Sequence, residues 1–437
     1  MNRLFYCCLA IAFASAAHAA EDCHIGSYRL DNGTLVDIAP SDGDALRWRQ
    51  FDGTTGALHR TAGDDWRSTY GWTDRADGVT VSFPDCAAGR ITFRGASGTK
   101  IAFDVRDAAF VSHGVRLVGR LVLPKGQDQV PVVVLVHGAE QDSALTLYSL
   151  QRMLPAQGIG AFVFDKRGTG VSGGQYTQDF SLLADDDVAA MQEARRLAGA
   201  RLGRIGYQAG SEGGWVAPIA ANRSPVDFVI VCFGLTVNVR DEDQEAVELQ
   251  LREKGYAPGE IADAQKVASA AETVFESDFT RGFEQFDALK ARYQHARWYK
   301  DLRGDFTFFL LGHSDAELRA MKTKFDWHTP FHYDGMSTLR ANGTPQLWIL
   351  GGEDYEAPSA ETMKRLKSLI AEGRPLTLAY YPAAEHGMTL FETAADGSRV
   401  STRYAPGYFA MIRDFARDGQ LGDAYGDAQM TLPRAVR

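Results

Sequence analysis

The stretch RIGYQAGSEGGWVAP, residues 204–218, decides the fold of this chain. It opens as a short apolar run typical of a strand and continues beyond Gly213 as a helix. At the junction lies Ser211, within the sequence Ala-Gly-Ser-Glu-Gly of residues 209–213. A serine on a sharp turn between a strand and a helix needs such small neighbours, because the turn is strained and the strand and helix pass closely. The stretch therefore predicts a nucleophilic serine at Ser211.

Two other serines fit this pattern less well. Ser172 lies in a literal G-x-S-x-G match, Gly-Val-Ser-Gly-Gly, but the chain continues as Gln-Tyr-Thr rather than as a helix. Ser314 follows the strand-like run FTFFLL, residues 306–311, but no further strand separates it from the strand QLWILGG. A glycine-rich phosphate loop is the alternative for the turn around Ser211, and that turn lacks the Lys-Ser/Thr pair and the G-x-G-x-x-G spacing.

Outward from Ser211, apolar strands without polar alternation take turns with helical stretches from about residue 106 onward. Continuous apolar strands are typical of a parallel sheet covered on both faces, and the helices complete β-α-β units. The predicted fold class is therefore α/β, with a mostly parallel sheet, helices on both faces, and a leading hairpin in residues 115–124. The predicted strands are residues 130–138, 159–165, 204–210, 228–234, 346–352 and 376–382. The predicted helices lie near residues 143–157, 180–198, 212–222, 359–372 and 405–416.

Two further regions precede and interrupt this alternation. Residues 20–105 contain short alternating runs separated by turn pairs such as Asn32-Gly33, Asp52-Gly53 and Asp77-Gly78, which predicts a small antiparallel β domain. Within the α/β domain, residues 106–437, a mostly helical stretch at about 238–340 interrupts the strands. A structureless loop of that length is unusual, so we expect a helical cap over the end of the sheet where ligands bind.

The chain begins with a secretory pattern. A basic residue precedes the apolar run of residues 4–13, and Ala-His-Ala at residues 17–19 places small residues where a signal peptidase cleaves. Residues 1–19 are therefore predicted to be the signal peptide of a periplasmic or secreted protein, too short to cross a bilayer. Disulfides persist in those compartments, so Cys23 and Cys86 are expected to pair, with two free thiols as the alternative.

Charge and composition exclude several classes of function. The chain has 437 residues, a formal net charge of -10 and 45% hydrophobic residues, an ordinary globular composition. It offers no Lys/Arg cluster for a basic face, so no nucleic-acid partner is expected. No H-E-x-x-H motif or Cys/His zinc spacing is present, and Pro330 interrupts the pair His328 and His332, so neither a metal nor another cofactor is expected. The oligomeric state stays open.

A serine becomes nucleophilic when a base takes its proton, and the base needs an acid to fix its tautomer. In this order of strands the acid and then the base follow the serine along the chain. Asp354 follows the strand QLWILGG, with Glu353 and Glu356 as near rivals, and His386 follows the last predicted strand, LTLAYYP. We therefore predict Ser211, Asp354 and His386 as catalytic residues.

Attack on a carbonyl also needs two backbone N–H groups that stabilise the oxyanion, one after the nucleophile and one in the loop after an early strand. The predicted donors are Glu212, directly after Ser211, and Ala139, beside Gly138, which lets the backbone approach. The turn Asp-Lys-Arg-Gly-Thr-Gly of residues 165–170 closes a neighbouring strand. We interpret this turn as structural scaffolding beside the site.

Together these motifs resemble the α/β-hydrolase superfamily, and within it the serine aminopeptidase-like branch related to the prolyl oligopeptidases. The resemblance covers roughly residues 106–420 and leaves the N-terminal β domain outside; Ala209 stands where the motif has glycine. It rests on VLVHG, FDKRGTGVSGG, AGSEGGWVAP, GGEDYEAP and AAEHGM. It implies Ser211 as nucleophile, Asp354 as acid, His386 as base, and Ala139 and Glu212 as the oxyanion hole.

The residues and the resemblance imply a secreted serine hydrolase that cleaves a small-molecule carboxylic ester through an acyl-enzyme. A serine peptidase, aminopeptidase-like and acting on small peptides or amides, is the alternative within the same chemistry. An aminopeptidase needs a carboxylate for the substrate ammonium, and Glu140, Glu212 and Glu385 are the candidates. The alternative from another class is a non-catalytic binding protein on a hydrolase scaffold, which usually lacks a triad member.

Overall fold

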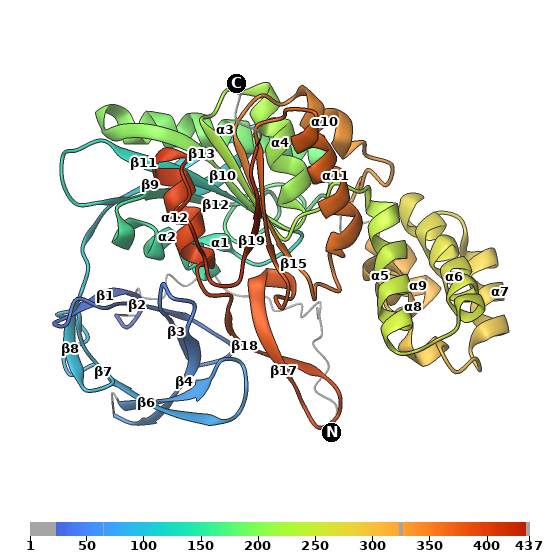
Figure 1. Ribbon diagram of the computed structural model, residues 1–437, viewed down its shortest axis with the longest axis horizontal. Helices are drawn as coiled ribbons and strands as arrows, with labels where there is room; N and C mark the ends of the chain where they lie inside the picture. Colours follow the sequence, from blue (N-terminus) through green and yellow to red (C-terminus); the bar gives the residue numbers. More distant parts are fainter. Residues whose placement is uncertain (1–22, 64, 323–326, 434–437) are drawn as a thin grey trace.

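The structure, a computed structural model, describes residues 23–63, 65–322 and 327–433, and the predicted signal peptide lies outside these ranges. The described residues form a small β barrel, a sheet flanked by helices, and a separate group of helices (Figure 1). In Figure 1 the barrel lies below the sheet, and the helical group projects to the right of the sheet.

The N-terminal part is a closed antiparallel barrel, in which β1 pairs with both β2 and β8. Alternate side chains point inward and form a core of their own that includes Tyr28, Ile38, Trp48 and Phe93. The predicted antiparallel β domain is therefore confirmed. The strands are β1 (Gly26–Leu30), β2 (Leu35–Pro40), β3 (Leu46–Arg49), β4 (Thr55–Ala62), β5 (Asp65–Tyr70), β6 (Ala76–Ser82), β7 (Arg90–Phe93) and β8 (Ala96–Lys100).

Two of the predicted turn pairs connect strands, and the third does not. Gly33 follows β1 and Gly53 follows β3, with φ of 84° and 95° that glycine adopts readily. Asp77-Gly78 lies inside β6 instead, where Asp77 Oδ1 accepts a hydrogen bond of 2.8 Å from the N–H of Val79. This local bond accounts for the Asp-Gly pair, and the predicted turn at this position is wrong.

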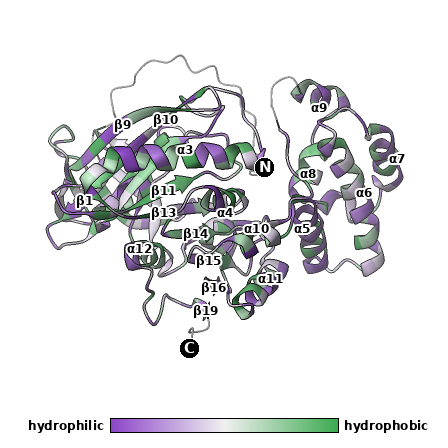
Figure 2. Ribbon diagram, turned by 90° about the horizontal axis from the view of Figure 1, so that it is seen from above, coloured by the Kyte–Doolittle hydropathy of each residue, from purple (hydrophilic) through white to green (hydrophobic). Residues whose placement is uncertain are grey.

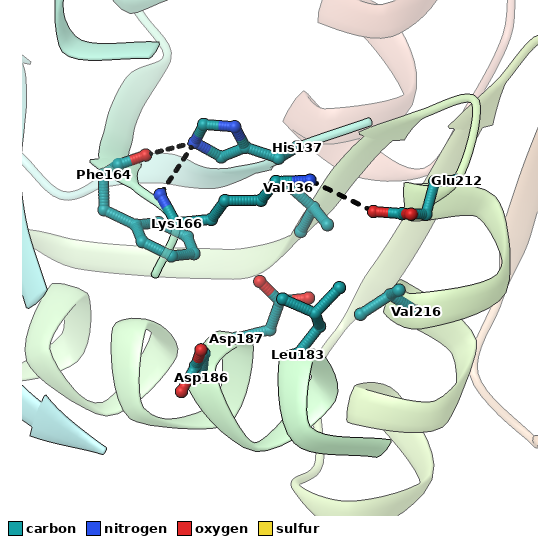
Figure 3. Close-up of a pocket in the computed structure, with 9 residues that line it drawn as sticks. All are labelled: Val136, His137, Phe164, Lys166, Leu183, Asp186, Asp187, Glu212 and Val216. Atoms are coloured by element: carbon teal, nitrogen blue, oxygen red, sulfur yellow. Dashed lines mark hydrogen bonds and ion pairs between the residues drawn. The ribbon is translucent and has the colours of Figure 1, made fainter. Parts of the chain in front are cut away.

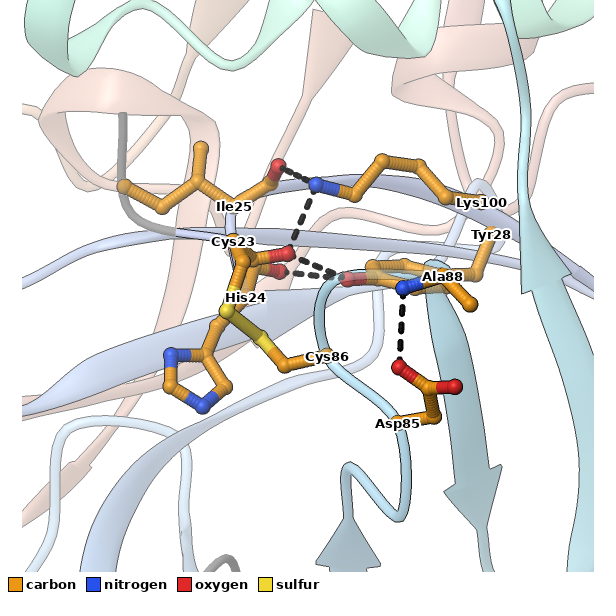
Figure 4. Close-up of a disulfide and its surroundings, with 8 residues drawn as sticks. All are labelled: Cys23, His24, Ile25, Tyr28, Asp85, Cys86, Ala88 and Lys100. Atoms are coloured by element: carbon orange, nitrogen blue, oxygen red, sulfur yellow. Dashed lines mark hydrogen bonds between the residues drawn. A yellow bond between two sulfur atoms is a disulfide. The ribbon is translucent and has the colours of Figure 1, made fainter. Parts of the chain in front are cut away.

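Cys23 and Cys86 form the predicted disulfide, with their Cα atoms 5.4 Å apart (Figure 4). It ties the first described residue to the loop between β6 and β7. Lys100, the last residue of β8, adds hydrogen bonds of 2.7 Å from Nζ to the carbonyl oxygens of Cys23 and Ile25. The start of the barrel is thereby fastened to its last strand and to a distant loop.

The second part is a sheet with the strand order β19-β16-β15-β14-β13-β11-β12-β10-β9. The strands from β12 to β16 in this order run parallel, and β9, β10 and β19 are antiparallel to their neighbours. The predicted α/β class is confirmed. The strands are β9 (Phe103–Ser112), β10 (Val115–Pro124), β11 (Val130–Val136), β12 (Gly160–Asp165), β13 (Leu202–Gly210), β14 (Phe228–Cys232), β15 (Gln346–Gly351), β16 (Leu376–Tyr381) and β19 (Gln429–Thr431).

Helices cover both faces of this sheet, which is why its strands are apolar without alternation. In β11, Val132 and Val134 pack into the core that α3, α4 and α11 share, whereas Val133 and Leu135 pack into the core that α12 shares. The helices are α1 (Ala144–Leu147), α2 (Leu150–Met153), α3 (Phe180–Ala198), α4 (Gly213–Arg223), α11 (Ser359–Ala371) and α12 (Tyr408–Asp418). Short 3-10 turns are η1 (Pro155–Gln157), η2 (Gly199–Arg201), η3 (Tyr299–Asp301) and η4 (His386–Met388).

The third part is the helical insertion between β14 and β15, seen from above in Figure 2. The run FTFFLL, which resembles a strand in sequence, is helix α8: Phe306 and Phe309 lie one turn apart, and their rings are 4.5 and 6.3 Å from that of Phe275 in α6. None of the helices in the described ranges is long and apolar enough to cross a membrane. The helices are α5 (Val239–Glu253), α6 (Pro258–Glu276), α7 (Phe283–Tyr293), α8 (Asp305–Leu311), α9 (Asp315–Met321) and α10 (Gly335–Ala341).

The barrel rests on a hairpin near the end of the chain, formed by β17 (Thr389–Thr393) and β18 (Arg399–Tyr404) (Figure 1). The N–H of Trp72 donates to the carbonyl oxygen of Ser401 at 2.9 Å. Gly71 lies so close to the hairpin that a Cβ there would be 2.3 Å from the carbonyl oxygen of Thr402. The backbone of the barrel therefore contacts the backbone of the hairpin directly.

Candidate active site

Ser211 occupies a strained turn at the carboxyl end of the central strand β13. Its φ is 53°, in the left-handed region that costs a non-glycine residue about 1–2 kcal/mol. Its N–H donates to the carbonyl oxygen of Cys232 at 3.1 Å, and its own carbonyl accepts from Gly214 at 2.7 Å. The side chain makes no hydrogen bond to any residue in the described part of the chain. The strained turn thus leaves the Ser211 hydroxyl without a hydrogen-bond partner in the described part of the chain.

The glycines after Ser211 allow the helix to start where it does. A Cβ at Gly213 would lie 2.6 Å from the carbonyl oxygen of His137, and one at Gly214 would lie 2.9 Å from the Cα of Gly234. Side chains larger than hydrogen would therefore push α4 away from the sheet. A serine on such a turn between a central strand and a helix is the arrangement of the α/β-hydrolase fold.

The structure brings His386 and Asp354 together in the loops that follow β16 and β15. Nδ1 of His386 is 3.1 Å from Oδ1 and 3.0 Å from Oδ2 of Asp354. The carboxylate of Asp354 is buried and also accepts backbone hydrogen bonds from Glu356 and Ala357, at 3.0 and 2.8 Å. The ring of Phe233 stands edge-on to the imidazole, with centroids 4.8 Å apart. These contacts fix the position of the imidazole from several sides.

Negative charge around His386 favours its protonated form. Burial alone would lower the pKa of the imidazole, but Asp354 and then Glu356 outweigh burial and raise the pKa to about 10. Oε2 of Glu356, an exposed side chain, is 3.6 Å from Nε2, the nitrogen that a nucleophilic serine would use. Both carboxylates therefore favour the cationic imidazole.

The two predicted oxyanion donors lie beside the serine turn. Gly138 is close enough to it that a Cβ there would be 3.4 Å from the Cβ of Ser211. The next N–H, that of Ala139, and the N–H of Glu212 donate to no other group in the described ranges. Two backbone donors without acceptors, on either side of a reactive hydroxyl, can stabilise a developing oxyanion.

The rival residues have other partners. Glu353 pairs with Arg399, with Oε2 and Nη2 2.7 Å apart, and does not contact His386. The hydroxyl of Ser172 donates to the carbonyl oxygen of Asp165 and accepts from the N–H of Val118 at 2.9 Å, so it joins loops. Ser314 caps α9 and is therefore structural, as its sequence context indicated.

The three carboxylates proposed from sequence for an ammonium are already bonded. Glu212 pairs with Lys166 at 3.2 Å, and Glu140 accepts from the Tyr148 hydroxyl. Burial would raise the pKa of Glu140, but the His137 side chain, Lys166 and Tyr148 lower it to about 2. Glu385 accepts from the hydroxyls of Thr389, at 3.0 Å, and Ser401. These three acids are therefore parts of the framework.

Acids of the helical insertion also act on this part of the site, and the sequence did not reveal them: Asp305 favours the protonated form of His386, and Asp354 raises the pKa of Glu242. Glu242 in α5 is 7% exposed, and its side chain has no hydrogen bond or ion pair with another described residue. Burial, followed by Asp305 and Asp243, raises its pKa well above the usual range. Asp305, at the start of α8, keeps some solvent-exposed surface. Desolvation by the surrounding protein and the charge of Glu356 nevertheless raise its pKa, and the charge of His386 opposes this rise. Only the folding of the insertion brings Asp305 within reach of the imidazole charge.

No family model matches the chain, and no curated protein matches it in sequence. Among solved structures it is similar to an acylaminoacyl peptidase from Pyrococcus horikoshii, with a TM-score of 0.44 and 14% identity over 91% of this chain and 58% of that one. It is also similar to an esterase from Pyrococcus furiosus, with a TM-score of 0.42 and 13% identity over 65% of this chain and 84% of that one. For a 2,6-dihydroxy-pseudo-oxynicotine hydrolase the TM-score is 0.39 and the identity 14%, over 64% and 62% of the chains. This chain thus spans less than two thirds of the length of the acylaminoacyl peptidase.

Proposed function

We propose that this chain is a serine hydrolase that cleaves carboxylic esters through a covalent acyl-enzyme. One observation carries the proposal: a strained Ser211 at the end of β13 shares one edge of the sheet with His386 and its buried partner Asp354. A hydroxyl, a base and an acid that orients the base are the parts that nucleophilic acyl transfer requires.

In the proposed reaction, neutral His386 accepts the Ser211 proton at Nε2 while Asp354 holds the N–H at Nδ1. The Ser211 oxygen bonds to the ester carbonyl carbon, and the alcohol leaves with the proton from His386. A water that gives a proton to His386 then attacks the acyl-enzyme and releases the carboxylic acid and Ser211. The N–H groups of Ala139 and Glu212 stabilise the oxyanion in both halves.

The test is labelling of the protein with a fluorophosphonate probe, together with hydrolysis of p-nitrophenyl butyrate. We expect labelling and turnover in the wild type and neither in Ser211→Ala. Ser172→Ala and Ser314→Ala are the matched controls and should keep both, because these serines bond within the framework. Full turnover by Ser211→Ala contradicts the assignment. A wild type that is neither labelled nor active supports the non-catalytic binding protein instead.

The acids of the cap favour a second candidate, a peptidase that acts on small substrates with a free amine. Asp305 on the helical insertion and Glu356 on the acid loop act on His386 and favour its cationic form, and Asp305 also raises the pKa of the buried Glu242. A substrate ammonium would compensate these carboxylates and would also free His386 from Glu356. An ester without a cation would leave them uncompensated.

Paired substrates separate the two candidates. Alanine p-nitroanilide carries a free amine, and its N-acetyl derivative does not. A peptidase that recognises the amine should prefer the first, and Asp305→Asn should reduce that preference. Glu284→Gln, an exposed acid on α7, is the control and should keep it. Equal rates on the two anilides, both far below the rate on p-nitrophenyl butyrate, support the esterase.

We also propose that the protein is periplasmic or secreted and that its mature chain begins after residue 19. The pairing of Cys23 and Cys86 supports this location, since disulfides persist outside the reducing cytoplasm. N-terminal sequencing of protein recovered from the periplasm or the medium of an expressing bacterium should begin at Ala20. A cell-associated protein that retains Met1 contradicts the proposal.

A further inference from the structure

Lys166 follows β12 and lies beneath both loops of the proposed oxyanion hole. Its side chain is 3% exposed, and its Nζ is 3.2 Å from Oε1 of Glu212 (Figure 3). The same Nζ donates to the carbonyl oxygen of Gly138 at 2.6 Å. The ring of Tyr176 lies over the ammonium, with its centroid 4.7 Å away. One cation thus contacts the loop after β11 and the turn after β13.

The contact with Gly138 sets the direction of a proposed oxyanion donor. The carbonyl of Gly138 and the N–H of Ala139 belong to the same peptide group, and none of the peptide bonds in the described ranges is cis. In a trans peptide the C=O and the N–H point in opposite directions. Because Lys166 holds the carbonyl on one side, the Ala139 N–H faces the other side. The hydroxyl of Tyr176 fixes the next carbonyl, that of Ala139, at 2.6 Å.

The contact with Glu212 holds the second donor. Glu212 supplies its own backbone N–H to the proposed oxyanion hole, and its side chain is 4% exposed. Its carboxylate has an ion pair only with Lys166 among the described residues. Burial raises the pKa of this carboxyl, and the charge of Lys166 opposes the rise. The hydrogen bond from the ammonium therefore holds the Glu212 side chain in place.

The surroundings show that Lys166 does more than fill space. Its stem borders a small cavity that is lined by apolar side chains, among them Val136, Leu183 and Val216, and also by polar ones (Figure 3). Burying an ammonium destabilises the fold unless charged and polar partners compensate the lost hydration. An apolar side chain at this position would therefore fill the cavity at a smaller cost in folding free energy. Asp187 also borders the cavity, but burial and then Asp186 raise its pKa well above the usual range, so it competes little for the cation.

We propose that Lys166 is a positioning residue of the oxyanion hole, because its ammonium bonds to Gly138 and Glu212 and thereby aligns the Ala139 and Glu212 N–H groups. The proposal rests on the serine-hydrolase function proposed above. It assigns a role in the reaction to a turn whose sequence indicated scaffolding alone. Lys166 itself does not touch the substrate.

The decisive variants are Lys166→Met and the double variant Lys166→Met with Glu212→Gln. The substrate is p-nitrophenyl butyrate, and each rate is divided by the Ser211 sites that a fluorophosphonate titrates. Misaligned donors should lower kcat of both variants by about 10- to 100-fold, with KM changed less than about twofold. The double variant removes the unpaired charge of Glu212 but still leaves Gly138 without a donor. It should therefore recover thermal stability and not kcat.

Arg167→Met is the matched control. Arg167 is the next residue, is equally buried, and forms two hydrogen bonds of 2.6 Å with Asp186, but it contacts neither oxyanion loop. It should lose stability and keep kcat per titrated site. A trifluoromethyl ketone, whose adduct with Ser211 is a tetrahedral oxyanion, should bind more weakly to the Lys166 variants and normally to Arg167→Met.

The outcomes are distinct. Wild-type kcat in the double variant would mean that Lys166 only neutralises Glu212, and the proposal would be wrong. Equal losses in kcat for Lys166→Met and Arg167→Met would also overturn it, because buried charge alone would then explain both. A wild type that is not labelled at Ser211 would overturn the serine-hydrolase function itself, which is a different result.

Discussion

The two sides of the candidate site are supported in different ways. On the oxyanion side, the loops after β11, β12 and β13 contact one another within the sheet domain, and Lys166 joins them. On the histidine side, the loop that carries His386 leads directly into the hairpin β17–β18, on which the barrel rests. Glu385 accepts from Ser401 in this hairpin, and the Ser401 carbonyl accepts from Trp72 of the barrel.

The two halves of the site should therefore depend on different parts of the molecule. In the sheet domain, Lys166 holds the oxyanion donors, and backbone bonds to Cys232 and Gly214 hold the nucleophile; α2 of this domain also meets the barrel, where Arg152 pairs with Asp37 of β2 at 2.8 Å. The proposed base is connected, through a hairpin, to a domain that contributes no residue to the proposed chemistry. The N-terminal barrel is therefore more than an appendage, since it supports the segment that follows His386. The predictions below test each half.

The largest effect is expected on the histidine side, from Asp354→Asn. The amide presents an N–H as well as an oxygen to Nδ1, so it no longer selects the tautomer that leaves Nε2 free, and kcat should fall about 10⁴-fold. The measurement is hydrolysis of p-nitrophenyl butyrate per titrated site. Glu353→Gln is the neighbouring control, because Glu353 pairs with Arg399, and it should change kcat less than about twofold. Equal losses in both variants would mean that Asp354 has no special role.

Gly71→Ala should disturb the same side from a distance. A methyl group there meets the Thr402 backbone, at 2.3 Å for an unshifted chain, so the barrel and the hairpin must move apart. We expect kcat to fall about tenfold through a misplaced His386. Overpacking should add about 1–3 kcal/mol to the loss of unfolding free energy.

Gly43→Ala is its matched control. The two glycines have φ of 57° and 60°, but Gly43 faces open space. Both variants should therefore lose about 1–2 kcal/mol of unfolding free energy from the left-handed backbone, and only Gly71→Ala should lose kcat. Thermal unfolding and kcat are measured on the same samples. Unchanged kcat in a destabilised Gly71→Ala would show that the barrel does not support His386.

Glu356→Gln should move a pH profile rather than reduce the maximal rate. Asp354 and Glu356 together outweigh burial and raise the pKa of His386 to about 10, so the loss of Glu356 lowers this pKa. The reaction needs neutral His386, and its acid limb should therefore move to lower pH. The measurement is kcat/KM between pH 5 and 10, with Glu284→Gln as a remote control. An unmoved acid limb would mean that Glu356 is displaced from Nε2 before the proton transfer.

The smallest effect on catalysis is expected from Cys23→Ser with Cys86→Ser. The disulfide closes a separation of 63 residues, so its loss should reduce the stability of the barrel by about 2–4 kcal/mol. It lies near β1, β7 and β8, across the ring from β4, which packs on the hairpin. At a temperature where the barrel stays folded, kcat should change less than about twofold. A large loss of kcat would extend the support of His386 to the whole barrel.

Much of this architecture follows from local sequence, because its signals are local. Continuous apolar strands predict the covered sheet, and small residues around Ser211 predict the strained turn. Asp354 and His386 could be proposed because loops at the ends of parallel strands meet at one edge of the sheet. That placement needs only the order of strands, which the apolar runs supply.

The features that sequence missed depend on contacts between distant segments. The run at residues 306–311 is apolar except for Thr307, and so short an apolar run suits a strand or a buried helix equally. Asp305 of the helical insertion acts on His386 only once the insertion has folded. Lys166 stands in a glycine-rich turn that suggested scaffolding, and its bond to Gly138 joins loops 28 residues apart. Contacts between such distant residues produce no periodic pattern in the sequence, so they could not be predicted from it.

The join between barrel and hairpin also sets an order of events during synthesis. The barrel is complete at Lys100, whereas Arg49 reaches its partner Tyr404 across 355 residues of chain. At roughly 5–20 residues per second, a ribosome needs about 15–60 s to make the 304 residues between Lys100 and Tyr404 (404 − 100 = 304). Throughout that interval the hairpin β17–β18, on which the barrel rests, has not yet been made. Because His386 and the hairpin follow Ser211 in the chain, a growing chain that already contains Ser211 lacks the proposed base until that segment has been made.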